Sequence, residues 1–140
     1  MGKSRKTLSD ADYRSLAEFR HLLRQFLAFS GDAARKEGLA PQQHQALLAI
    51  KGFGGVLTIG ELADKLLIKP HTAAELVDRL QKSGYIRKEA DHEDRRRTRL
   101  LLTAAAETLL LSLSRAHRDE LERLAPLLRP SLKSWESWSY

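Results

Sequence analysis

The chain has 140 residues, of which 42% are hydrophobic and 30% charged, with 24 Lys and Arg against 18 Asp and Glu. This length suits about one domain, and the composition is typical of a globular protein rather than a disordered one. Cysteine is absent, which excludes disulfides, thiolate metal sites and a cysteine nucleophile. No apolar run approaches the ~20 residues that span a membrane, and no hydrophobic segment follows residues 1–6, so we expect a cytoplasmic protein without a secretory signal.

The net charge of +6 is concentrated in two parts of the chain. Residues 1–38 hold 8 basic and 5 acidic groups, and residues 69–102 hold 9 and 6, so each segment carries +3. Residues 39–68 and 103–140 are balanced, with 2 of each sign and 5 of each sign. Arginine occupies four of the five positions from Arg95 to Arg99. Such a local excess favours an element that faces a polyanion.

A basic leader, residues 1–8, is expected to be mobile and to precede a long helix. Ser9 and the acidic Asp10 and Asp12 are typical of a helix start, and Gly38 of a helix end. Between them, apolar side chains recur at spacings of three and four, which predicts one apolar stripe along the helix that a second copy of the chain would cover. The stripe consists of Leu16, Phe19, Leu23, Phe26 and Leu27.

A second helix is predicted to begin at Pro41, because proline suits the first turn of a helix. It ends before the glycine-rich break at residues 52–55. Val56 and Leu57 are long enough only for a short extended piece.

A helix–turn–helix follows. Thr58 and Glu61 form a predicted capping box, in which the threonine oxygen accepts from the third amide and the glutamate reaches back. A short helix over residues 59–66 and a second helix over residues 70–83 are expected, separated by a three-residue turn and ended by Gly84. The apolar stripe of the second helix is Ala73, Leu76, Val77 and Leu80.

Two extended segments, residues 85–89 and 98–102, then flank a polar connector that is longer than a tight turn. Their alternation predicts a hairpin with a protruding tip. Thr103 caps a last long helix, which Pro126 and Pro130 are expected to kink or end, leaving residues 131–140 as a tail. The apolar positions of this helix are Leu110, Leu113, His117, Leu121, Leu124 and Leu128.

A capped short helix, a turn, a second helix and a basic hairpin together predict a winged helix–turn–helix, a mainly α fold with a small β-hairpin wing. The start of the second helix must be narrow and polar to enter the major groove of DNA. Arginine at a wing tip suits the narrow minor groove, which concentrates negative potential. We therefore predict that the chain binds duplex DNA through both elements. The predicted contact residues are Lys69, His71, Thr72, Ala74, Glu75, Arg79, Arg95, Arg96 and Arg97.

The chemistry of each predicted contact residue suggests a role in binding DNA, and for several of them a purely structural role is the alternative. His71 and Thr72 can donate hydrogen bonds to bases or phosphates, or they can simply be solvated at the start of the helix. Ala74 can contact a thymine methyl group. Arg95 is the expected minor-groove residue, although most runs of charge are only solvated. Arg96 can instead stiffen the wing through the nearby acids.

The remaining cations on the second helix are expected nearer the sugar–phosphate backbone than the bases. Arg79 is suited to a phosphate, or to an ion pair with Glu75 one turn back. Lys69 has a similar role.

Several segments together resemble the MarR family of regulators. They are residues 39–43 (LAPQQ), 57–63 (LTIGELA), 76–80 (LVDRL), 84–87 (GYIR) and 91–97 (DHEDRRR), followed by Leu102-Thr103. The resemblance covers residues 12 to about 125. It implies one domain over residues 9–130, with a DNA-binding part at about 40–102 and dimerisation helices at 9–38 and 103–130.

The same resemblance implies a homodimer that binds a pseudo-palindromic operator, usually as a repressor released by a small aromatic or phenolic effector. Aromatic residues of the first helix, Tyr13, Phe19, Phe26 and Phe29, could line an effector pocket or pack in the core.

Other functions have less support in the sequence. No phosphate-binding glycine loop or local catalytic arrangement indicates an enzyme, and no cofactor is expected. The five histidines lie on separate elements without ligand spacing, so no metal site is expected. The remaining alternative is a dimeric winged-helix module that binds another protein instead of DNA.

Overall fold

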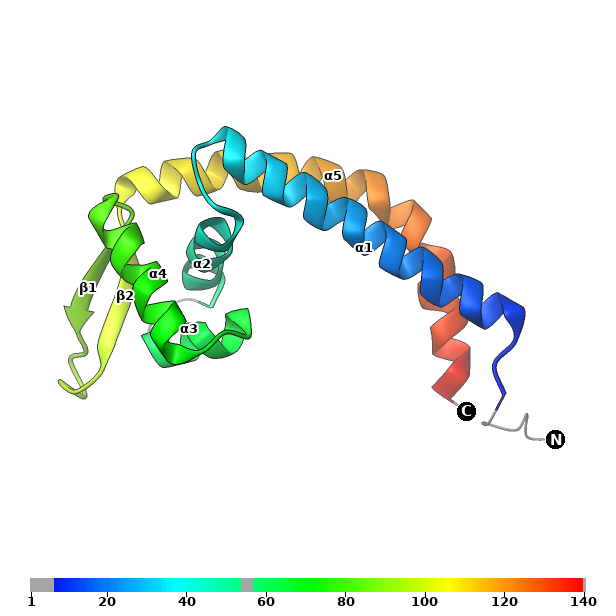
Figure 1. The fold of residues 1–140 in the computed structure, drawn as a ribbon, viewed down its shortest axis with the longest axis horizontal. Helices are drawn as coiled ribbons and strands as arrows, with labels where there is room; N and C mark the ends of the chain where they lie inside the picture. Colours follow the sequence, from blue (N-terminus) through cyan, green and yellow to red (C-terminus); the bar gives the residue numbers. More distant parts are fainter. Residues whose placement is uncertain (1–6, 54–56, 140) are drawn as a thin grey trace. The chain divides into compact units, whose positions relative to one another are not determined.

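The computed structural model describes residues 7–53 and 57–139 (Figure 1). The elements are, in order, α1 (Asp10–Lys36), α2 (Pro41–Gly52), α3 (Ile59–Leu66), α4 (Pro70–Lys82), β1 (Ile86–Ala90), β2 (Thr98–Leu102), α5 (Ala104–Glu136) and the 3-10 turn η1 (Ser137–Ser139). The expected fold class, mainly helical with a β-hairpin wing, is confirmed.

The chain divides into two compact parts. Residues 31–115 form what we call the winged unit, and the described residues up to 30 together with those from 116 onward form the helical unit. Both divisions fall within α1 and α5, so each of these helices contributes to both units. The division therefore lies inside the two segments that were expected to be dimerisation helices.

The core of the winged unit is built from α2, α3, α4 and the hairpin, together with the end of α1 and the start of α5. Its largest fully buried side chains are Leu47, Leu62, Val77, Leu80 and Ile86, which come from four different elements. β1 and β2 pair antiparallel, with Ile86 opposite Leu102. Burial of these apolar side chains stabilises the unit by roughly 25 cal/mol per Å² of apolar surface, and it is the main force that holds the wing and the helices together.

The α4 helix follows the predicted pattern closely. All four residues of its expected stripe are buried, because spacings of three and four place them on one face. Pro70 occupies the first turn, and Gly84 has a φ of +81°, the left-handed conformation that glycine adopts without strain. The chain reverses there, and the Tyr85 amide donates to the Leu80 carbonyl at 2.9 Å.

The capping box predicted at the start of α3 is present in one half only. The Glu61 amide donates to Thr58 Oγ1 at 3.2 Å, as expected. The Glu61 carboxylate does not reach back to the Thr58 amide but accepts from the Thr58 hydroxyl at 3.0 Å. The same carboxylate oxygen also accepts from Arg97 of the wing.

The helical unit is held by contacts between α1 and the C-terminal half of α5. The buried His117 lies against the rings of Phe26 and Phe29, with centroids 5.8 and 5.4 Å away, and shares a hydrogen bond of 2.7 Å with Ser30 Oγ. Farther along, the Phe19 ring meets the edge of Trp135 at 5.0 Å. Three of the four aromatic residues considered for an effector pocket thus pack within this unit.

The sequence predicted a kink or an end of α5 at its prolines and a tail over residues 131–140; the end is wrong, and residues 131–136 belong to the helix. The helix continues through Pro126 and Pro130 to Glu136. Each proline removes one backbone hydrogen bond and disfavours the preceding turn. Packing outweighs that cost, because the residues beyond the prolines contact α1: Trp135 lies on Phe19, and Trp138 Nε1 donates to Asp12 Oδ1 at 2.9 Å.

Some predictions fall on residues outside this description. Most of the expected leader, residues 1–6, and Val56 of the expected extended piece lie outside the described residues. Across residues 7–53 and 57–139, none of the helices combines the length and the apolar character that crossing a membrane requires.

Candidate nucleic-acid interface

The outer face of α4 carries the residues predicted to enter a groove. Lys69 is the N-cap, and His71, Glu75 and Arg79 are exposed, whereas Thr72 and Ala74 are half-buried at the edge of this face. The buried stripe on the opposite side leaves this face toward solvent. Its first turn also presents free amide groups, which favour a phosphate oxygen.

The ion pair considered between Glu75 and Arg79 does not form. The neighbouring Asp78 is paired instead, with Lys88 of β1. Arg79 therefore keeps an exposed guanidinium group that no ion pair within the described residues occupies. This arrangement leaves it available to a phosphate.

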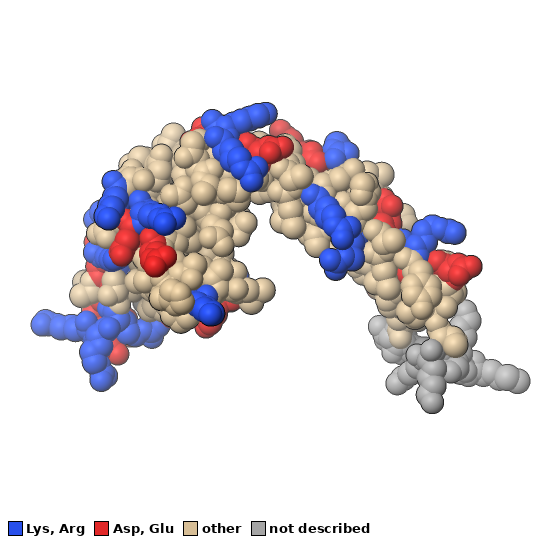
Figure 2. Space-filling model, viewed as in Figure 1, with Lys and Arg blue, Asp and Glu red and all other residues tan. Residues whose placement is uncertain are grey.

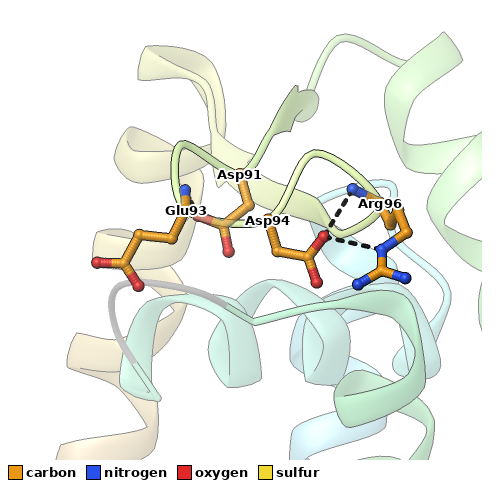
Figure 3. A network of polar contacts seen from close by, with 4 residues as sticks. All are labelled: Asp91, Glu93, Asp94 and Arg96. Carbon is orange, nitrogen blue, oxygen red and sulfur yellow. Dashed lines mark hydrogen bonds and ion pairs between the residues drawn. The ribbon is translucent and has the colours of Figure 1, made fainter.

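The wing loop holds the three arginines predicted for the tip, and they are not equivalent. Figure 2 shows Lys and Arg side chains gathered at the end of the hairpin. Arg96 donates from its backbone amide at 3.0 Å and from Nε at 3.3 Å to one oxygen of Asp94, as the dashed lines in Figure 3 show. Its side chain is nevertheless 92% exposed, so the outer guanidinium nitrogens face solvent.

Acidic side chains shape the loop itself. Asp91 Oδ1 accepts from the Glu93 amide at 3.3 Å, a local turn next to the Asp94–Arg96 contact (Figure 3). The Asp91 amide donates to the Arg97 carbonyl, and the Arg97 amide donates to the Asp94 carbonyl, both at 3.0 Å. These bonds close the loop.

Arg95 and Arg97 differ in their partners. Arg97 pairs with Glu61 at the start of α3. The Arg95 side chain is exposed and has no hydrogen-bond or ion-pair partner in the described part of the chain. Of the three arginines predicted at the tip, Arg95 is thus the one whose charge is not paired with an acidic side chain among the described residues.

A second ion pair joins the wing to the helix–turn–helix. Lys88 Nζ of β1 lies 2.7 Å from Asp78 Oδ1 of α4. The hydrogen bond from Lys88, and then its positive charge, hold the pKa of Asp78 below the ordinary carboxyl value of 3.8. Sequence reasoning missed the ion pairs Asp78–Lys88 and Glu61–Arg97, because no local pattern reveals pairs that meet only through the fold.

Metal binding finds no support in the described residues. No group of three or more His, Asp or Glu side chains within residues 7–53 and 57–139 could hold an ion. The winged unit has an open apolar depression of about 430 Å³ between α2 and α3, lined mainly by Leu48, Phe53, Leu66 and Leu67. Lys65 lies over the Phe53 ring at 4.2 Å beside it.

A helix–turn–helix with an exposed, polar recognition face and a basic hairpin beside it defines a winged helix–turn–helix protein. Residues 37–97 match the model of the MarR family. Over 103 residues, 73% of its length, the chain is 34% identical to YcgE of Bacillus subtilis, named an uncharacterized HTH-type transcriptional regulator. The chain spans 66% of YcgE. It belongs to the MarR family, as the sequence predicted.

Solved structures share the fold. A probable transcriptional regulator from Pseudomonas aeruginosa is 26% identical, with a TM-score of 0.64 over 85% of this chain and 91% of that one. A variant of MepR from S. aureus, bound to an oligodeoxyribonucleotide, has a TM-score of 0.66 over 89% of this chain and 96% of that one, at 18% identity.

Proposed function

We propose that this chain is a sequence-specific, double-stranded-DNA-binding transcriptional regulator. The observation that carries the proposal is the pairing, within one compact unit, of the exposed first turn of α4 with the unpartnered Arg95 of the wing. These two elements suit neighbouring major and minor grooves. The shared fold of MepR, which is bound to DNA, and the name of YcgE support the same function.

In this proposal α4 reads the major groove. His71 and Thr72 meet bases or phosphates, Ala74 contacts a thymine methyl group, and Glu75 accepts from a cytosine amino group. Lys69 and Arg79 contact the phosphate backbone, which positions the helix without reading sequence. The exposure of His71, Glu75 and Arg79 supports these roles.

The wing supplies the minor-groove contact. Arg95 enters the groove, because its guanidinium has no competing partner in the described chain and a narrow groove attracts arginine. Arg96 remains attached to Asp94 through Nε and meets a phosphate with its outer nitrogens. Each arginine thus has a distinct role.

The functional molecule in this proposal is a homodimer. Exposed leucines lie along the helices of the helical unit, at 38–53% exposure on α1 and 45–50% on α5, and a second copy would cover them. They are Leu16, Leu23, Leu27, Leu121, Leu127 and Leu132. Two-fold symmetry then places two α4 helices in successive major grooves, about 10 base pairs apart, on a pseudo-palindromic operator.

Regulation forms the last part of the proposal. The chain acts as a repressor in the cytoplasm, and a small aromatic or phenolic effector releases it from DNA by binding its DNA-incompatible conformation more tightly. Membership of the MarR family is the support for this part. Thermal denaturation with a panel of phenols and aromatic carboxylates tests it: a stabilising compound that also lowers DNA affinity is expected, and no shift with any compound contradicts it.

DNA binding itself is tested by fluorescence anisotropy with random duplex DNA at about 50 and 200 mM salt. Each phosphate that the protein neutralises lowers the logarithm of the affinity by ~0.9 per tenfold rise in salt. A fall by orders of magnitude is expected for six or more contacts. A folded dimer that binds no duplex at low salt contradicts the proposal and favours the alternative, a winged-helix module for protein partners.

A further inference from the structure

The carboxylate of Glu61 joins two parts of the winged unit that are 36 residues apart in the sequence. One of its oxygens, Oε1, accepts from the Thr58 hydroxyl at 3.0 Å and also from Nη2 of Arg97. The Glu61 amide donates to Thr58 Oγ1 at 3.2 Å. The Thr58 hydroxyl, itself held by the Glu61 amide, therefore orients the carboxylate at the start of α3.

Arg97 is equally constrained on its own side. Its amide and carbonyl close the wing loop through Asp94 and Asp91, both at 3.0 Å, and it directly precedes β2. Within β2, the Leu100 amide donates to the Leu57 carbonyl at 3.2 Å. The returning arm of the wing is thus attached to the segment that starts α3 at two points, one through the main chain and one through the ion pair.

The pair adds little to folding stability. The Arg97 and Glu61 side chains are 49% and 43% exposed, and solvent screens exposed ion pairs until they contribute almost nothing. The ion pair instead affects the position of the wing and the charge at its tip. The pair fixes the base of the loop that carries Arg95, and it neutralises one of the three tip arginines.

We propose that Glu61 and Arg97 form a positioning pair that orients the wing for DNA and withholds the Arg97 charge from phosphates. This inference rests on the proposed DNA-binding function. It assigns the direct contacts of the tip to Arg95 and Arg96. Arg97 then acts through Glu61, and the pair raises the preference for a cognate site over random DNA.

The salt dependence of binding separates positioning from direct contact. If Arg97 touched a phosphate, its replacement would reduce the salt slope by ~0.9. If it only positions the wing, Arg97→Gln lowers affinity for a selected duplex by about two- to fivefold, the range of an exposed ion pair, and leaves the slope unchanged. The Tm stays within a few degrees of the wild-type value in this case, which confirms that folding is intact.

Glu61→Gln provides the opposite perturbation. Glutamine keeps an oxygen that can accept from Thr58 but loses the charge that holds Arg97. The released arginine is expected to raise affinity for random duplex DNA and to steepen its salt slope by up to ~0.9. The ratio of selected to random affinity therefore falls, although the protein has become more basic.

The closing experiment is a double-mutant cycle by fluorescence anisotropy at 50–200 mM salt. It compares the wild type, Arg97→Gln, Glu61→Gln and the double variant on a selected and a random duplex. Non-additive effects on the selected duplex are expected. Arg87→Gln is the matched control, because Arg87 carries the same charge on β1 but pairs with Glu89 of its own strand at 3.4 Å; its effects should add to those of Glu61→Gln.

The outcomes separate the two proposals. A wild-type protein that binds duplex DNA while Arg97→Gln loses about 0.9 of the salt slope overturns the positioning role alone. Additive effects of Glu61→Gln and Arg97→Gln do the same. A wild-type protein that binds no duplex overturns both the DNA-binding function and this inference.

Discussion

Replacing Arg95 with alanine removes the one tip arginine without a polar partner among the described residues. In the minor groove its guanidinium neutralises about one phosphate charge, and one such charge changes affinity as the ~0.9 power of salt concentration. Its loss at about 0.1 M salt therefore costs about eightfold in affinity, or ~1.2 kcal/mol. The salt slope should fall by ~0.9 at the same time. Since the side chain is exposed, the free energy of unfolding should stay within about 0.5 kcal/mol.

The assay is fluorescence anisotropy over 50–200 mM salt, with thermal denaturation of the same samples. Arg35→Ala is the matched control, because Arg35 is 62% exposed and pairs with Asp32 of its own helix, α1, outside the predicted contact residues. It removes an equal charge, and we expect less than a twofold change. Unaltered affinity and slope in Arg95→Ala would refute the role of the wing in DNA contact.

Three further predictions concern the winged unit. Leu80→Ala should lower the free energy of unfolding by about 2–5 kcal/mol in denaturant titrations, because Leu80 has 0% exposure in the core; a loss below 1 kcal/mol would contradict that packing. Gly84→Ala should destabilise by about 1 kcal/mol, since φ is +81° and no atom lies within 4 Å of an added Cβ, so only backbone strain contributes; an unchanged Tm would refute the left-handed turn. The pKa of Asp78 is lowered by Lys88, so its contribution to stability is present above the ordinary carboxyl pKa and is lost as pH falls through the folded value. In an NMR titration, Lys88→Met should raise that pKa toward 3.8, and an unchanged midpoint would show that the pair does not form in solution.

Local signals predicted most of the winged unit. In α4 the apolar spacing, Pro70 and Gly84 each act over a few residues, and each was confirmed. The strands also fell within one residue of expectation, because alternation of apolar and charged residues is a local property. The contact residues on α4 and the wing remain predictions that only binding measurements can test.

The contacts that the sequence did not reveal depend on distant segments. Glu61 meets Arg97 and Asp78 meets Lys88 only because the hairpin folds back on the helices. The same reason explains α5: local rules predict that Pro130 disfavours a helix, but Trp135 packs on Phe19, more than one hundred residues earlier in the chain. The packing of Trp135 on Phe19 outweighs the local preference of proline against a helix.

The central claim, that a symmetric dimer reads duplex DNA through α4 and the wing, is tested most directly by selecting duplexes from a randomised pool. Selection at about 200 mM salt suppresses binding that depends on phosphates alone. We predict enrichment of inverted half-sites whose centres lie about 10 base pairs apart. A pool that stays random after repeated rounds with folded protein would contradict sequence-specific recognition.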